Sequence, residues 1–151
     1  MADLHIEEFF GDAGRILVSL YRIFPRPVTL FVEDICGPDE PDEYGVHSHR
    51  HQACFATMLF MQVHGFISYN ETIRSEALDQ TSLSGACLSL LLSPMPTVHA
   101  ADQASKDSSL PASVQAEHST AIFQLEQAVK NHDVLATTTI MQHLLQQMTR
   151  T

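Results

Sequence analysis

A stretch rich in serine, alanine and proline divides the chain into two unequal parts. Residues 93–113 contain five serines, four alanines and three prolines, and no aromatic residue. Such a composition is typical of a flexible linker, because it offers few side chains that a core could bury. We therefore predict a folded domain over residues 1–92, a linker over residues 93–113 and a separate C-terminal segment over residues 114–151.

The first part begins with the pattern of a long amphipathic helix. Apolar residues recur every three or four positions from Leu4 to Phe24, which is the spacing of one helix face. Pro25 and Pro27 follow directly. Because proline lacks a backbone N–H and disfavours helical geometry in the residue before it, these two residues predict the end of the helix.

Shorter elements are expected in the rest of the first part. Ser48 is placed to cap a second helix, and Gly65 to end it in the left-handed conformation that glycine adopts at low cost. Residues 34–45 hold five carboxylates, two prolines and two glycines, a composition that predicts an exposed acidic loop. The remaining segments are expected strands at Val28–Glu33, Phe66–Tyr69 and Glu76–Thr81, and a helix at Leu83–Leu92 that starts at Ser82 or Ser84.

Two stretches carry a resemblance to a known family. Met58–Ile67 ends a core helix with glycine and an aromatic residue, and Ala77–Gly85 leads from an extended segment into a helix. Together with the order of elements, these stretches resemble the winged-helix family over residues 4–92. The resemblance implies a small α+β fold that binds DNA or protein. A second helix usual in that family would have to be short here, because the acidic loop takes its place.

If the resemblance extended to DNA binding, the helix Ser48–His64 and the wing Asn70–Glu76 would contact the duplex. Arg50, Gln52 and Arg74 are the side chains in those segments suited to that contact. The charge argues against it, because the whole chain carries −10 and 13 of its 18 acidic residues lie within residues 1–95. Such a field repels phosphates, so nucleic acid is disfavoured and a protein partner with a basic surface is favoured.

Three histidines at alternate positions form the most conspicuous local motif. His47, His49 and His51 share a face in an extended chain, whereas His47 and His51 share one in a helix. With carboxylates just upstream, the motif could bind Zn²⁺ or another divalent cation. The alternatives are that the imidazoles simply pair with the neighbouring carboxylates, or that they form a pH-responsive cluster.

No motif of a known catalytic class is present. The chain lacks GxSxG, GxxxxGK[ST] and GxGxxG, and Cys36, Cys54 and Cys87 form no CxxC pair. We therefore expect no enzymatic activity, and no cofactor unless the histidines bind Zn²⁺. The first ten residues lack the pattern of a signal peptide, no apolar run is long enough to span a membrane, and the odd cysteine count opposes a disulfide framework. The cytoplasm is the expected compartment.

The C-terminal segment Val114–Met148 has helical character but is too short to build its own core. Asn131–Asp133 could divide it, with Asp133 capping a second helix; a single bent helix is the alternative. The segment must pack on something, and we favour a second copy of the chain over its own domain. The residues expected in that homodimer interface are Ile122, Leu125, Val129, Ile140, Leu144 and Leu145.

These observations favour a non-enzymatic regulatory or protein-interaction subunit, homodimeric through its C-terminal helices. A dimeric winged-helix transcriptional regulator that binds DNA is the first alternative. A metal-responsive sensor that uses His47, His49 and His51 is the second.

Overall fold

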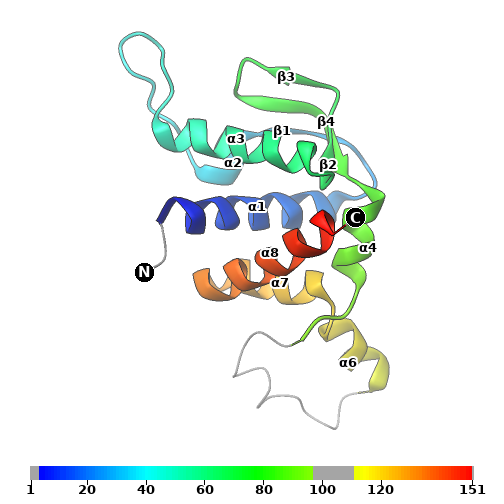
Figure 1. The fold of residues 1–151 in the computed structure, drawn as a ribbon. Helices are drawn as coiled ribbons and strands as arrows, with labels where there is room; N and C mark the ends of the chain where they lie inside the picture. Colours follow the sequence, from blue (N-terminus) through cyan, green and yellow to red (C-terminus); the bar gives the residue numbers. More distant parts are fainter. Residues whose placement is uncertain (1–3, 97–110, 151) are drawn as a thin grey trace.

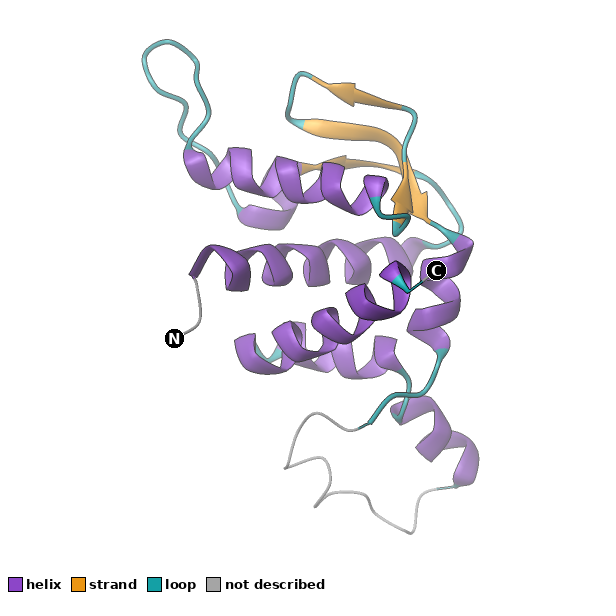
Figure 2. Ribbon diagram, in the orientation of Figure 1, coloured by secondary structure: helices purple, strands orange, loops and turns teal. Residues whose placement is uncertain are grey.

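The computed structural model describes residues 4–96 and 111–150. The strands all lie between α1 and α4 in the chain, and only helices follow them among the described residues; Figure 2 distinguishes helices and strands by colour. In chain order they are α1 (Leu4–Ile23), β1 (Val28–Phe31), α2 (Val32–Cys36), α3 (His49–Val63), β2 (Ile67–Ser68), β3 (Glu71–Ile73), β4 (Ala77–Leu83), α4 (Gly85–Leu92), α6 (Ala112–His118), α7 (Ala121–Lys130) and α8 (Val134–Thr149). Helices joined to a small antiparallel sheet confirm the α+β class.

Helix α1 lies at the centre of the fold. Helices α2 and α3 and the sheet lie on one side of it, and α7 and α8 lie on the other (Figure 1). Ile16, Leu17 and Leu20 of α1 are almost completely buried. The predicted helix from Leu4 is therefore confirmed, with its end one residue earlier than expected, and it is buried on more than one face.

Strand β4 organises the sheet, because β1, β2 and β3 all pair with it in antiparallel fashion. The strand predicted at Val28–Glu33 ends earlier, at Phe31, because the short helix α2 begins at Val32. Strand β3 was not predicted. It forms a hairpin with β4 through Arg74 and Ser75, whose φ angles of +49° and +58° match the twist of a tight hairpin turn.

The helix ends follow the chemistry of their capping residues. The Oγ of Ser48 accepts a hydrogen bond of 3.2 Å from the backbone N–H of His51 at the start of α3. Ser84 caps α4 in the same way, with 3.0 Å to the N–H of Cys87. Gly65 follows α3 with a φ of +81°, as predicted for a left-handed C-terminal residue.

The C-terminal segment packs on α1 of the same chain. Asp133 caps α8, so α7 and α8 are two helices rather than one bent helix. Gly14 of α1 permits their close approach, because a Cβ added there would lie only 3.0 Å from the Cγ2 of Thr137. Leu125 and Ile140 consequently share one core with the residues of α1.

The start of the predicted linker is hydrogen-bonded to the residues around the start of α7, and its last two residues, Ala112 and Ser113, belong to helix α6 instead. The N–H of Met95 donates to the carbonyl of Ser119 over 2.9 Å, and the N–H of Ala121 donates to the carbonyl of Ser93 over 2.9 Å. Met95 is 8% exposed. The middle of the linker prediction, residues 97–110, lies outside the described residues. Within the ranges that the structure describes, no helix is long and apolar enough to cross a membrane.

Candidate functional site

The structure brings two of the three predicted histidines together and leaves the third apart. The rings of His47 and His51 stack, with centroids 3.8 Å apart and an interplanar angle of 10°. His49 is exposed and does not belong to this group. The cluster is completed by Asp39, so that Asp39, His47 and His51 each offer one ligand atom within 4.8 Å of the others. We refer to these three residues as the His–Asp cluster.

Asp39 comes from the acidic loop, yet its side chain is only 3% exposed. Its Oδ1 accepts hydrogen bonds from the hydroxyl and the backbone N–H of Ser48, at 2.6 and 3.3 Å. Its Oδ2 lies 2.6 Å from the Nδ1 of His47. The hydrogen bond from the Ser48 hydroxyl, reinforced by the His47 ring, lowers the pKa of Asp39 to about 2 despite its burial.

His51 is 2% exposed and is held by the β3–β4 hairpin. Its Nε2 lies 2.9 Å from the carbonyl oxygen of Ser75. Because a carbonyl only accepts, Nε2 must carry the proton. Nδ1 then has a free lone pair in the neutral ring, and it finds no hydrogen-bond partner among the described residues. The Oδ2 of Asp39 lies 3.7 Å from this nitrogen.

The sequence motif thus identified part of the cluster. His47 and His51 are four residues apart, which is the helical spacing considered above, although His47 itself precedes the helix. Asp39 was missed because the loop holds five carboxylates and only its folded path shows which one returns to the histidines. Two imidazole nitrogens and a carboxylate oxygen are donors that suit Zn²⁺ and similar divalent cations.

The three residues considered for DNA contact have different surroundings. Arg50 points to α1, where its Nη1 and Nη2 lie 2.7 and 2.6 Å from the two carboxylate oxygens of Asp12. These hydrogen bonds raise the pKa of Arg50 above its ordinary value. Gln52 is exposed and donates from Nε2 to the carbonyl of His47 over 2.8 Å. Arg74 is exposed at the tip of the β3–β4 hairpin.

The carboxylate that engages Arg50 was not identified from the sequence. Asp12 is on the buried side of α1, with a side chain only 1% exposed. A second arginine, Arg15, also donates to Asp12, and its Nε donates to the carbonyl of Ile35 over 3.1 Å. A buried carboxylate requires such partners. Its position beside Ala13 and Ile16, inside the apolar stripe, was the available signal.

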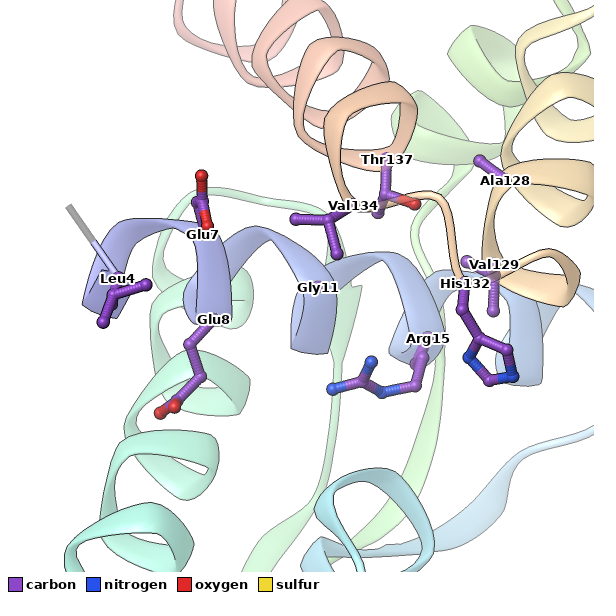
Figure 3. A pocket seen from close by; sticks show the side chains of 10 residues that line it. All are labelled: Leu4, Glu7, Glu8, Gly11, Arg15, Ala128, Val129, His132, Val134 and Thr137. Carbon is purple, nitrogen blue, oxygen red and sulfur yellow. The ribbon is translucent and has the colours of Figure 1, made fainter. Parts of the chain in front are cut away.

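A groove of about 500 Å³ lies between the N-terminal half of α1 and the turn that joins α7 to α8. Figure 3 shows Val134 and Thr137 of α8 above Gly11 of α1, with His132 beside Arg15. Two of the apolar side chains at the groove are well exposed, Leu4 by 80% and Val134 by 55%. The full lining is Leu4, Glu7, Glu8, Gly11, Arg15, Ala128, Val129, His132, Val134 and Thr137.

The residues expected in a homodimer interface face the core of their own chain. Ile122, Leu125, Ile140 and Leu144 are buried, while Val129 and Leu145 are partly buried against the same core. The alternative considered above, packing on its own domain, is the arrangement that the structure has. A dimer of this conformation would need other side chains, and dimerisation itself stays a prediction.

Comparisons with family models, curated proteins and solved structures find no match to this chain.

Proposed function

We propose that this chain is a non-enzymatic regulatory domain that binds a basic segment of a protein partner in the groove between α1 and the α7–α8 turn. The observation that carries the proposal is the composition of this groove. It combines exposed apolar side chains with two carboxylates, Glu7 and Glu8, on a chain of net charge −10.

The apolar part of the groove favours binding to another molecule. Leu4 and Val134 present aliphatic surface to solvent, and Leu135, 78% exposed, is the next residue of α8. Gly11 has no side chain to fill the floor, and a Cβ added there would touch only the Arg15 guanidinium, at 3.6 Å. Burial of such surface by a partner is favourable in proportion to the area removed from water.

The charge of the groove favours a basic segment. Asp12 pairs with both Arg15 and Arg50, so the charge of these two arginines is balanced only when Glu8 is counted together with Asp12. Glu8 lies 3.5 Å from Arg50, whereas Glu7 has no ion-pair partner in the part of the chain that the structure describes. An amphipathic helix that places apolar residues in the groove and lysine or arginine beside Glu7 would complement it.

The order of the elements supports the winged-helix resemblance, which we include in the proposal. Helix α1 precedes β1, the short α2 and α3, and a β3–β4 hairpin and α4 follow. The pairing of β1 and β2 on β4 is compatible with such a fold. Helix α2 lies between β1 and α3, where the family has its second helix, although it begins within the predicted strand and overlaps only the start of the acidic loop.

The function favoured here is protein binding rather than DNA binding or catalysis. Arg50 is engaged by Asp12, which leaves Arg74 as the cation free to approach a duplex among the residues considered for that role. Burial raises the pKa of the Cys54 and Cys87 thiols, which opposes a nucleophilic role. All three cysteines are free thiols, which suits a reducing compartment such as the cytoplasm.

A peptide titration with matched variants tests the proposal. The probes are two amphipathic helical peptides of about 14 residues with the same leucine positions, one with lysine and one with glutamate on the polar face. Gly11→Leu fills the groove, and Ser19→Leu is the control because Ser19 is an exposed position on the same helix. We expect ¹⁵N–¹H shifts at groove residues with the lysine peptide and none with the glutamate peptide. Gly11→Leu should weaken binding of the lysine peptide by about tenfold, and Ser19→Leu should leave it unchanged.

Equal affinity for both peptides, or equal loss in both variants, would overturn the proposal. Sedimentation of the free protein separates a further case. A concentration-dependent dimer that Gly11→Leu abolishes would show that the groove holds a second copy of the chain instead of a basic partner.

A further inference from the structure

We propose that Asp39, His47 and His51 form a binding site for a divalent transition-metal ion, with Zn²⁺ as the best match, and that the ion fixes the acidic loop and the start of α3 beside the β3–β4 hairpin. The site lies outside the groove and does not depend on the proposed partner. It also differs from the histidine triplet in the sequence motif, because Asp39 takes the place of His49.

The first support is the identity and spacing of the donors. The Nδ1 atoms of His47 and His51 lie 2.6 and 3.7 Å from the Oδ2 of Asp39. Ligand atoms bound tetrahedrally to Zn²⁺ at about 2.0–2.1 Å are separated by roughly 3.3 Å. The two distances lie on either side of this value. The stacked rings of His47 and His51 would have to rotate out of their parallel arrangement for both Nδ1 lone pairs to meet one ion beside Asp39.

The second support is the unpartnered nitrogen of His51. This side chain is 98% buried, and its Nδ1 makes no hydrogen bond within the described ranges. A buried polar atom without a partner is costly and rare in proteins. The lone pair that the Nε2–Ser75 contact leaves on Nδ1 is the electron pair that a metal ion requires, and it lies on the side of the ring near Asp39.

The third support is the set of groups behind the ligands. Metal-bound histidines usually donate their other ring N–H to a carbonyl or carboxylate, which fixes the tautomer. The Nε2 of His51 has the carbonyl of Ser75 at 2.9 Å, whereas the Oε1 of Glu76 lies 3.8 Å from the Nε2 of His47, beyond hydrogen-bond distance. Asp39 is likewise oriented by Ser48, which donates from both its hydroxyl and its backbone N–H.

The alternative, in which the imidazoles only hydrogen-bond to the carboxylate and no ion is bound, explains less of this geometry. The proton between His47 and Asp39 accounts for their 2.6 Å contact. The same arrangement leaves the Nδ1 of His51 without a hydrogen-bond partner, because the nearest carboxylate oxygen is 3.7 Å away, too far for a hydrogen bond. An ion that replaces this proton would engage all three side chains together.

The ligands connect parts of the fold that are distant in sequence. Asp39 and His47 belong to the loop between α2 and α3, and His51 belongs to α3. Through its contact with Ser75, His51 also connects α3 to the turn of the β3–β4 hairpin. Three protein ligands leave the fourth tetrahedral position to water or to a donor from another molecule.

Metal titration of the full chain tests the site. After treatment with a chelator, the protein is titrated with Zn²⁺ by calorimetry and with Co²⁺ by visible absorption, which reports tetrahedral coordination. We expect one ion per chain for the wild type. His47→Gln and Asp39→Asn should weaken binding by about 100-fold or more, whereas the control His49→Gln should leave it unchanged.

Two further measurements keep the outcome decisive. Circular dichroism establishes that each variant is folded, and His47→Gln is the preferred variant because its side chain, unlike that of His51, is 20% exposed. In ¹⁵N–¹H spectra, Zn²⁺ should shift the amides of Ser75 and Glu76 through His51. A wild type without stoichiometric binding at micromolar Zn²⁺, binding retained in folded His47→Gln, or equal loss in His49→Gln would overturn the proposal. The groove variant Gly11→Leu should bind Zn²⁺ normally, so failure of either proposal can be told from failure of the other.

Discussion

Two carboxylates of this protein are almost completely buried, and their surroundings differ in kind. Asp12 is 1% exposed and is bonded by two arginines, whose charge is permanent. Asp39 is 3% exposed. It accepts hydrogen bonds from Ser48 and lies beside two histidines, which can be neutral. The comparison indicates that Asp12 has a structural role, because its partners are complete. Asp39 belongs to a group in which the Nδ1 of His51 has no hydrogen-bond partner among the described residues, so that this group can accommodate a ligand.

Asp12, Arg15 and Arg50, which we call the Asp12 group, join three helices. Arg50 of α3 contacts both carboxylate oxygens, and Arg15 of α1 reaches from Asp12 to the carbonyl of Ile35 in α2. Two parallel hydrogen bonds between a guanidinium and a carboxylate fix orientation as well as distance. Loss of the carboxylate would leave two arginines without their main partner.

The largest effect is therefore expected for Asp12→Ala. Removal of one member of a buried ion pair costs about 3–5 kcal/mol. We expect about 2–4 kcal/mol here, because the side chains of Arg15 and Arg50 are 40% and 34% exposed and solvent screens part of the loss. Urea unfolding measures it, with Asp34→Ala as an exposed control that should change stability by less than about 0.5 kcal/mol. Similar values for both variants would remove the distinction drawn between Asp12 and the surface carboxylates.

A smaller loss is expected when only the geometry of the pair is changed. Arg50→Lys keeps the charge but cannot form two parallel hydrogen bonds with Asp12, so we expect a destabilisation of about 1–2 kcal/mol. Arg74→Lys is the matched control at the exposed hairpin tip and should be nearly neutral. Thermal unfolding of the two variants compares them directly. If Arg50→Lys were as stable as Arg74→Lys, the two hydrogen bonds would not contribute as the geometry indicates.

The contribution of Asp39 should depend on pH in a defined direction. Its pKa is about 2 in the folded chain, against about 3.9 in an unfolded chain. The ionised carboxylate therefore adds stability above about pH 4, and this contribution is lost as the pH falls toward 2. We expect the difference in unfolding free energy between wild type and Asp39→Asn to shrink from pH 5 to pH 2. A difference that is constant over this range would contradict the lowered pKa, as would a carboxyl titration near 4 in NMR spectra.

The difference between these two groups also shows what the sequence could and could not predict. Local chemistry was predictable: Ser48, Gly65 and Asp133 mark helix ends where the structure has them, and the apolar spacing from Leu4 gave α1. Such features depend on neighbours within a few residues. Strand β3 and helix α2 were missed or misplaced because three and five residues carry too little periodic signal.

Contacts between residues far apart in the chain could not be predicted from the sequence pattern. Arg50 looked free to contact DNA because Asp12, its partner, is 38 residues away. In the same way, nothing local distinguished Asp39 from the other carboxylates of its loop. The apolar stripe around Leu125 and Ile140 correctly required a partner surface, but only the packing identified this surface as α1 of the same chain.

The smallest expected effect is on thiol reactivity. Labelling of Cys54 reports local opening near Asp12 and should therefore distinguish Asp12→Ala from Asp39→Ala. Burial, reinforced by the charge of Asp12, raises the pKa of the Cys54 thiol, and burial raises that of Cys87 to about 12. Iodoacetamide should therefore label half-buried Cys36 in the native protein and leave Cys54 and Cys87 unmodified. Asp12→Ala should allow labelling of Cys54 through local opening, whereas Asp39→Ala should not, with peptide mass mapping as the readout. Cys54 is a buried residue of α3. Equal protection of Cys54 in both variants would therefore mean that the Asp12 group does not hold α1 against α3.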